Sequence, residues 1–349
     1  MESGGDAIGD RLRTALGVVG ALSDAGAPRH EVWREGRCVL YRYEPQAPQQ
    51  VRTPLLICYA LVNRPTMLDL QPGHSLIRNL LAAGVSVYLL DWGYPQSADR
   101  HEQLDDYVNG WLHECIVQVS QDSGTARSAA AQRNPVNLLG VCQGGVLSLC
   151  HAALHPGMVR NLVTMVTPVD FQTPQDLLSR WARGIDTELM GGLGNIPGAL
   201  LNALYMALLP FRLSQQKYLS MALLLDDPAG LEHFMRMEHW IGDSPDQAAI
   251  AFTQFVKWFY QENRLLKGTL SLGGRPVNLR AIRCPILNLY GLRDHLVPAD
   301  ASRALRGLAG SRDYEELALD LGHIGMYVSR RAQQAVGPAI AAWLAARDG

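Results

Sequence analysis

The chain has 349 residues, enough for one large α/β domain with an inserted subdomain or for two modest domains. Its net charge of −2 argues against the broad positive field that draws proteins to nucleic acid or anionic lipid. The six cysteines are scattered without CxxC spacing, so neither a disulfide framework nor a zinc site is indicated. We expect most of these cysteines to be buried thiols.

The N-terminus shows no signal for export. It is acidic where a secretory signal is basic, and no apolar stretch with a small-residue cleavage site follows it. The longest apolar stretch, residues 196–211, is interrupted by Asn202 and is shorter than the roughly 20 residues that a membrane span needs. We therefore expect a cytoplasmic protein in which this stretch forms a buried or surface-associating helix.

In chain order, the first expected element is a short amphipathic helix over residues 6–24, where apolar side chains recur at helical spacing. Alternating apolar residues around the turn at Glu35-Gly36 then predict a hairpin between residues 32 and 43. Compact apolar runs of strand length follow at residues 55–61, 85–90, 136–139, 162–166 and 286–290. A weaker strand is expected over residues 314–319, and a final helix over about residues 331–346.

These runs predict the fold class. The first four are separated by segments long enough for helices, and they are apolar on both faces, as a parallel sheet covered by helices requires. The alternation fails between about residues 171 and 276, which fits either a helical insertion between the sixth and seventh strands or an irregular helical stretch. We predict an α/β-hydrolase fold, with a mostly parallel central sheet, helices on both faces and an inserted helical cap.

The expected organisation has four parts. They are an N-terminal amphipathic helix region (1–30), a first part of the hydrolase core (31–170), a cap or lid insertion (171–275) and a second part of the core (276–349).

The sharpest local signal is the sequence Gly-Val-Cys-Gln-Gly-Gly at residues 140–145. It follows an expected strand and precedes a helical pattern, the context of a nucleophile elbow, and its small residues suit a tight turn. Cys142 stands where the nucleophile is usually serine, and the start of a helix favours its thiolate. A structural turn with a buried thiol is the alternative. Cys150, two turns further along, is expected to belong to the core.

An acid and a histidine should follow in that order, each after a later strand. Asp294 follows the run at 286–290, and His323 lies in the Gly-His-Ile-Gly sequence after the strand at 314–319. The alternatives are a turn aspartate and a surface histidine. His295 is the rival base, and we expect it to support the site by hydrogen bonding instead. The remaining histidines are expected to be ordinary residues without partners in register.

The oxyanion formed by thiolate attack needs two donors. The backbone N–H of Gln143 is the first, and the second is expected from the loop at Val62-Asn63, with the Val62 N–H as donor and Asn63 in a supporting role. No metal is expected in this site. A cysteine that exchanges with a coenzyme A thioester keeps the acyl group activated, whereas a serine ester would dissipate that activation. The constellation therefore favours acyl transfer over hydrolysis.

Several longer motifs extend over most of the chain from about residue 30. They are residues 59–65 (YALVNRP), 68–72 (LDLQP), 91–93 (DWG), 140–145 (GVCQGG), 166–171 (VTPVDF), 238–240 (EHW), 291–295 (GLRDH) and 322–325 (GHIG). In these motifs the chain resembles the polyhydroxyalkanoate (poly-3-hydroxybutyrate) synthases. The similarity is to the short catalytic PhaC subunits of the two-subunit types, class III, with class IV as the alternative.

The resemblance implies polymerisation of (R)-3-hydroxyacyl-coenzyme A, most often 3-hydroxybutyryl-coenzyme A, into polyester with release of coenzyme A. It implies that Cys142 carries the acyl chain, that His323 deprotonates Cys142 and the attacking hydroxyl, and that Asp294 orients and charges His323. It also implies a cap, a homodimer of the catalytic subunit, an accessory PhaE-type subunit (PhaR-type as the alternative) and a location at the surface of polyester granules. No cofactor is expected, because the substrate carries the coenzyme A.

Two other functions remain open at the level of sequence. One is a thioesterase or intracellular polyester depolymerase of the same fold. The other is a non-catalytic granule-binding protein whose apolar segment at residues 196–211 binds polymer.

Overall fold

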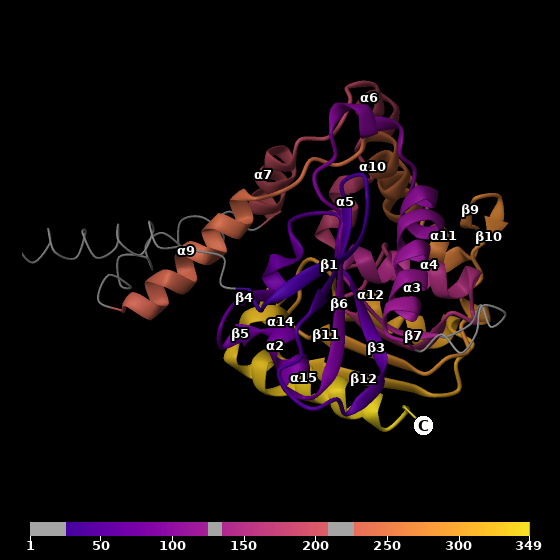
Figure 1. Ribbon diagram of the computed structural model, residues 1–349. Coiled ribbons are helices and arrows are strands. Elements are labelled where there is room, and N and C mark those ends of the chain that lie inside the picture. The colour runs from indigo at the N-terminus through magenta and orange to yellow at the C-terminus, as the bar shows by residue number, and fades with distance from the viewer. Residues whose placement is uncertain (1–25, 125–134, 209–226, 349) are drawn as a thin grey trace, which may run out of the picture.

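The computed structural model describes residues 26–124, 135–208 and 227–348. An eight-stranded sheet forms the centre of this part of the chain, in the order β1-β2-β6-β3-β7-β8-β11-β12 (Figure 1). The predicted α/β fold, a mostly parallel central sheet with helices on both faces, is confirmed. The helix expected over residues 6–24 lies outside the described residues.

The predicted hairpin is formed by β1 (Arg29–Glu35) and β2 (Cys38–Tyr43), which pair antiparallel. β2 is also antiparallel to β6, and every other pairing in this sheet is parallel. The parallel strands match the apolar runs of the sequence: β3 (Val51–Cys58), β6 (Val85–Asp91), β7 (Val136–Val141), β8 (Val159–Met165), β11 (Ile286–Gly291) and β12 (Tyr314–Leu319).

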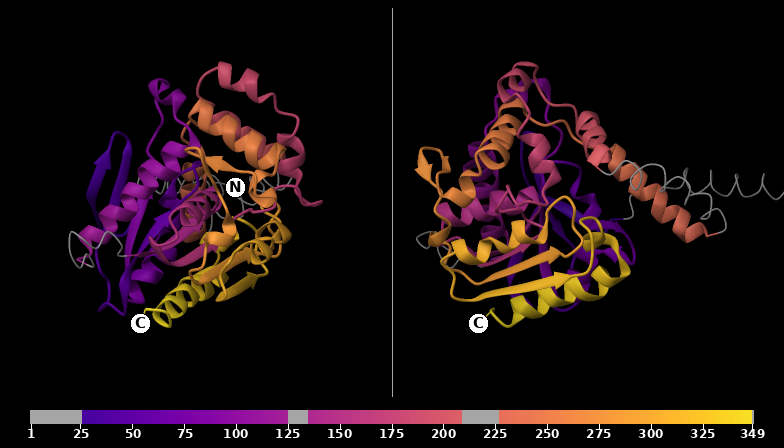
Figure 2. Two further views of the ribbon diagram at one scale, coloured as in Figure 1. Left: turned by 90° about the vertical axis from the view of Figure 1, so that its right-hand side faces the viewer. Right: turned by 180° about the vertical axis from the view of Figure 1, so that it is seen from behind.

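The side chains of alternate strand residues point into two separate hydrophobic cores, one on each face of the sheet. Within β3, Leu56 and Cys58 belong to one core and Leu55 and Ile57 to the other, as the two-residue period of a strand requires. Helices cover both faces (Figure 2). One face packs against η3 (Asp106–Leu112), α3 (His113–Asp122) and α4 (Gln143–Leu154), and the other against α2 (Leu76–Ala82), α14 (Gly325–Val328) and α15 (Arg330–Ala345).

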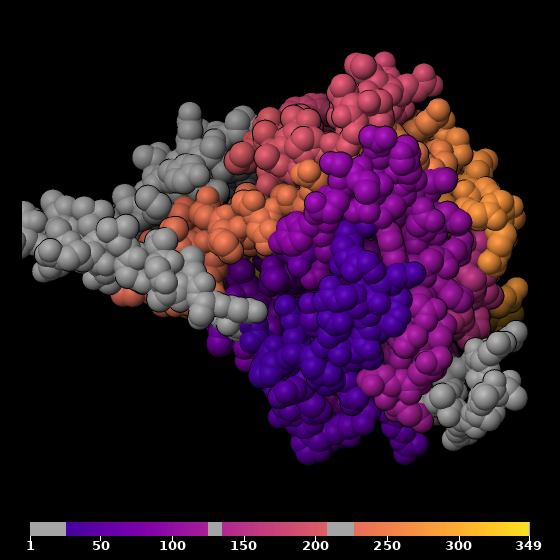
Figure 3. All heavy atoms as spheres, turned by 45° about the horizontal axis from the view of Figure 1, so that its top comes forward, coloured from indigo at the N-terminus to yellow at the C-terminus, as the bar shows by residue number. Residues whose placement is uncertain are grey.

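The chain leaves the sheet after β8 and returns at β11, the sixth and seventh strands of the sheet in chain order. We call the helical segment between them the cap. Seen in space-filling form, it lies over one end of the core (Figure 3). Its described elements are α5 (Leu177–Ala182), α6 (Thr187–Gly192), α7 (Gly198–Leu208), α9 (Pro228–Gly242), α10 (Ala249–Phe255), η5 (Val256–Gln261), α11 (Arg264–Lys267), β9 (Ser271–Leu272) and β10 (Arg275–Pro276).

Short elements complete the described chain: η1 (Pro65–Leu68), β4 (Asp69–Gln71), β5 (His74–Ser75), η2 (Ser97–His101), η6 (Leu279–Ala281), α12 (Ala299–Arg303) and α13 (Leu305–Leu308). Within the expected apolar helix at residues 196–211, α7 is described only to Leu208, and it exposes Leu200, Leu204 and Met206. In the described ranges, no helix has both the length and the apolar character that crossing a bilayer demands.

A buried amide fixes the place where the chain re-enters the sheet. Asn288 on β11 accepts a hydrogen bond from the Thr164 hydroxyl of β8 at 2.9 Å. Its amide nitrogen donates to the carbonyl of Ser302 on α12 and to the hydroxyl of Tyr314 on β12, both at 3.0 Å. Because Asn288 is fully buried, these bonds fix the position of β11, and Asp294 lies in the loop that follows this strand.

Replacing Asn288 with alanine is therefore expected to lower the free energy of unfolding by about 3 kcal/mol, because buried groups on three neighbouring elements lose their partner. The midpoint and slope of urea unfolding measure this change. The matched control is Glu315→Ala, an exposed residue on β12 that pairs with Arg347, which should cost about 1 kcal/mol or less. Equal effects of the two variants would contradict the locking role of Asn288.

Candidate active site

Cys142 occupies a strained turn between β7 and α4. Its backbone has φ 53° and ψ −121°, a region that side-chain-bearing residues rarely adopt, and its N–H donates to the Met165 carbonyl at 2.9 Å. A Cβ added to Gly144 would lie 2.2 Å from the Cys58 carbonyl oxygen, and one added to Gly145 would lie 1.9 Å from Oγ1 of Thr167. The glycines after Cys142 thus let α4 pack directly against the strands.

Asp294 and His323 meet beside this turn. Asp294 follows β11 and His323 follows β12, two adjacent parallel strands, and Nδ1 of His323 lies 2.7 Å from Oδ2 of Asp294. The other oxygen of Asp294 accepts hydrogen bonds from the N–H groups of Leu296 and Val297, both at 2.9 Å. The carboxylate is therefore held on both sides and is directed at the imidazole, with both side chains buried.

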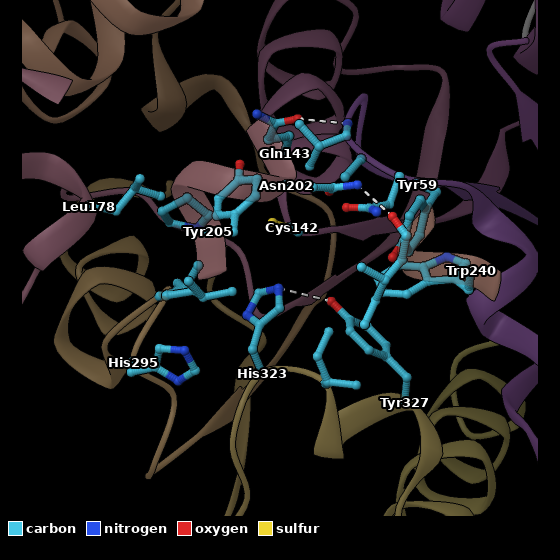
Figure 4. A pocket seen from close by; sticks show the side chains of 18 of the residues that line it. Tyr59, Cys142, Gln143, Leu178, Asn202, Tyr205, Trp240, His295, His323 and Tyr327 are labelled. Atoms are coloured by element: carbon cyan, nitrogen blue, oxygen red, sulfur yellow. Dashed lines mark hydrogen bonds between the residues drawn. The ribbon is translucent and has the colours of Figure 1, made fainter. Parts of the chain in front are cut away.

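The second ring nitrogen of His323 faces the thiol side of the pocket (Figure 4). Burial alone would lower the pKa of His323, but the Asp294 carboxylate and the interaction with Cys142 together raise the pKa to about 10. These interactions stabilise the protonated form of the ring, so transfer of the thiol proton from Cys142 to His323 is favoured. The structure brings together the three residues predicted as nucleophile, acid and base.

Tyr327 is a further neighbour of His323 that the sequence reading did not single out. Its hydroxyl lies 3.2 Å from Nε2 of His323. Tyr327 lies on the short helix α14, which begins two residues after His323, and the sequence analysis expected no helix there. Tyr59 packs edge-on against Tyr327, with ring centroids 6.3 Å apart.

The two predicted oxyanion donors, the N–H groups of Gln143 and Val62, are linked through the Gln143 side chain, which the sequence analysis did not predict. The side-chain oxygen of Gln143 accepts hydrogen bonds from the N–H groups of Leu61 and Val62, at 3.2 and 3.3 Å. The Val62 N–H, one of the two predicted donors, is therefore hydrogen-bonded to the side chain of Gln143. The backbone N–H of Gln143 is the other predicted donor. The side-chain amide of Gln247 in the cap donates to the Leu61 carbonyl at 2.8 Å, so the cap also holds the loop that contains Leu61 and Val62.

These groups line one pocket between the core and the cap. Asn63 and His295 also line it, so His295 faces the cavity while Asp294 lies behind His323. The cap contributes largely apolar and aromatic side chains, among them Tyr205, Met237 and Tyr260. Trp240 of α9 lines the pocket too, and its indole N–H donates to the Arg64 carbonyl at 2.7 Å, a second link between the cap and the loop.

Comparisons with known proteins agree with this fold. The alpha/beta hydrolase fold family matches residues 53–329. Among solved structures, a monoacylglycerol lipase from Paleococcus ferrophilus is 16% identical, with a TM-score of 0.52 and coverage of 88% of this chain and 99% of that one. A thermophilic esterase from Thermogutta terrifontis is 15% identical, with a TM-score of 0.50 and coverage of 93% and 100%. At these identities the similarity shows the fold alone.

Curated relatives give the narrower family. A protein from Allochromatium vinosum named "Poly(3-hydroxyalkanoate) polymerase subunit PhaC" is 54% identical over 93% of this chain and 90% of its own length. This chain belongs to the PhaC family. The PhaC of Thiocystis violacea is 50% identical over 94% of this chain and 91% of its own, and that of Synechocystis sp. is 47% identical over 92% and 85%.

The electrostatic link between Asp294 and His323 is open to a chemical test. Replacing Asp294 with asparagine should lower the pKa of His323 and slow alkylation of Cys142 by iodoacetamide at neutral pH about tenfold or more, because less thiolate forms. Peptide mass spectrometry reports the rate at each cysteine. Cys58 and Cys150 should stay unmodified, because burial raises the pKa of each thiol to about 12.

The matched control is Asp300→Asn, an exposed carboxylate of α12 that pairs with Arg303. This variant should leave the alkylation rate unchanged. A rate that is the same in Asp294→Asn and in the unaltered chain would show that the carboxylate does not govern the reactivity of the thiol.

Proposed function

We propose that this PhaC family member polymerises (R)-3-hydroxyacyl-coenzyme A, with 3-hydroxybutyryl-coenzyme A as the expected substrate, and releases coenzyme A. The observation that carries the proposal is the buried His323, held by Asp294 and interacting with the thiol of an elbow cysteine in a covered apolar pocket. Identity of 54% to a protein named as a polymerase subunit narrows the reaction from acyl transfer in general to polyester synthesis.

In the first step, His323 takes the proton of the Cys142 thiol and the sulfur attacks the thioester carbonyl of the substrate. The bond between the carbonyl carbon and the coenzyme A sulfur then breaks, and the departing thiolate takes the proton from His323. One thioester replaces another, so little free energy is lost. Asp294 keeps Nδ1 of His323 hydrogen-bonded throughout, which leaves the other nitrogen for proton transfer.

In the second step, His323 takes the proton of a 3-hydroxyl group, and the oxygen attacks the acyl carbon bound to Cys142. An ester bond forms, the bond to the Cys142 sulfur breaks, and the proton on His323 balances the returning thiolate. Water would compete with the hydroxyl as acceptor. The apolar and aromatic side chains that the cap places over the thiol support transfer over hydrolysis, because they limit the access of water.

The tetrahedral oxyanion is proposed to bind the backbone N–H groups of Gln143 and Val62. The Val62 donor becomes available when the Gln143 side chain gives up its hydrogen bond, so the substrate oxygen replaces the Gln143 oxygen. The same side chain keeps the Leu61–Val62 loop in place before substrate arrives. Asn63 and His295 line the pocket, from which they can contact the substrate.

We further propose that the chain acts as a homodimer with a PhaE-type accessory subunit (PhaR-type as the alternative), in the cytoplasm at the surface of polyester granules. The relatives are named as subunits, which supports an assembly with a second kind of chain. Co-purification from the native host tests this assembly, since it reports the partner and the granule together. Recovery of the chain alone from granule-containing cells would contradict it.

Purified chain mixed with 3-hydroxybutyryl-coenzyme A is expected to give turbid polymer and free coenzyme A thiol. Cys142→Ala should abolish both, because it removes the acyl carrier, whereas Cys150→Ala, a buried change on the same helix, should keep them. Soluble hydroxy acid without polymer would identify a hydrolase. Unchanged thiol release by Cys142→Ala would remove this cysteine from the mechanism.

The two neighbouring histidines should differ sharply. His323→Gln is expected to lower the rate of coenzyme A release by at least about 100-fold, the usual contribution of a general base, and His295→Gln should lower it much less. Stopped-flow measurement of the first thiol release compares the two variants directly. The reverse ranking would assign the role of base to His295.

A further inference from the structure

Three histidines meet at the end of α4 remote from Cys142. His151 lies in the last turn of α4, His155 directly follows that helix, and His113 begins α3. One ring nitrogen from each lies within 4.8 Å of the others, and Nδ1 of His113 lies 3.3 Å from Nε2 of His151. The expectation that these histidines have no partners in register was wrong, although the four-residue spacing was visible in the sequence.

The hydrogen bonds around His155 fix its protonation. The amide nitrogen of Asn109 donates to Asp105 at 2.6 Å, so the amide oxygen of Asn109 is the atom that faces Nε2 of His155, at 2.9 Å. An amide oxygen only accepts, hence Nε2 carries the proton and Nδ1 of the neutral ring keeps its lone pair. A polar group that orients the far nitrogen of a ligand is typical of histidine metal sites.

His151 contributes a buried ring whose Nε2 faces His113. Its side chain is fully buried, and its Nδ1 atom has no hydrogen-bond partner. If Nε2 of His151 and Nδ1 of His113 were both ligands, their separation of 3.3 Å would match the spacing of about 3.3 Å between two ligands in tetrahedral zinc sites with Zn–N bonds of about 2.0–2.1 Å. His151 would then carry its proton on the unpartnered Nδ1.

The surroundings keep the rings neutral and leave a path for an ion. Burial lowers the pKa of all three, to about 4 for His155, so a metal need not displace a proton at neutral pH. Arg275, which donates to the Leu154 carbonyl, opposes a cation, while Glu114 and the carboxyl end of α4 favour one. A surface groove reaches His113, and Asn109, Glu114 and residues 33–35, which include Arg34, also line it.

We propose that His113, His151 and His155 bind a divalent transition metal, with Zn²⁺ as the expected ion. Three neutral imidazoles suit this class of ion. The ion ties the end of α4 to the start of α3, at a distance of about 14 Å along the helix from Cys142. It is a structural clamp on the helix that carries the thiol and takes no part in acyl transfer.

The test uses the full chain without a histidine tag, in the Cys142→Ala background so that the active-site thiol cannot bind the ion. After removal of metals, titration with Zn²⁺ followed by calorimetry should show one site per chain, and Zn²⁺ should raise the thermal unfolding temperature. His113→Ala and His155→Ala should each weaken binding at least about tenfold, and Asn109→Ala about tenfold, because it orients His155.

The matched control is His233→Ala. His233 and His74 form a two-histidine contact, with ring centroids 4.3 Å apart, that is separate from this cluster. This variant should bind Zn²⁺ as the parent does. Failure of the parent to bind, or affinity that stays the same in His113→Ala, His155→Ala and Asn109→Ala, would overturn the proposal. Equal loss in His233→Ala would do so as well. The unfolding temperature of each metal-free variant shows that it is folded.

Discussion

The site depends on one hydrogen bond, from Nδ1 of His323 to the carboxylate of Asp294. It gives the imidazole its orientation, and the adjacent charge counters the burial that would otherwise keep the ring neutral. The bond exists because β11 and β12 are neighbours in parallel register, so that their carboxyl ends deliver both side chains to one place. The loops after these strands are pinned together, since Leu292 and Arg293 donate to the carbonyls of Leu319 and Leu321.

The elbow contributes the complementary constraint. Cys142 keeps an unfavourable backbone conformation because β7 and α4 hold it from both sides, and α4 can approach only where Gly144 and Gly145 lack a side chain. The cap is linked to the same region through the loop after β3. Gln247 and Trp240 both donate to carbonyls of that loop, so movement of the cap would shift the loop that carries the Val62 N–H, the proposed oxyanion donor.

The sequence predicted the sheet and the meeting of Cys142, Asp294 and His323, for a physical reason. Strands buried on both faces must be apolar throughout, as β3 and β7 are, and the order of nucleophile, acid and histidine follows from the order of the parallel strands. The sequence could not predict that the Gln143 side chain would accept a hydrogen bond from the Val62 N–H, because a side-chain rotamer depends on packing between distant segments. The meeting of His113 with α4 depends likewise on how two helices pack.

The most direct test of the roles of Cys142 and His323 is the covalent intermediate itself. The chain is mixed briefly with 3-hydroxybutyryl-coenzyme A, quenched in acid and digested, and the peptide that contains residue 142 is weighed by mass spectrometry. The expected result is a hydroxybutyryl adduct on Cys142 that hydroxylamine removes, and no adduct in the same interval when His323 is replaced by glutamine. Release of coenzyme A with the acyl group on another residue, or on none at any time, would contradict it.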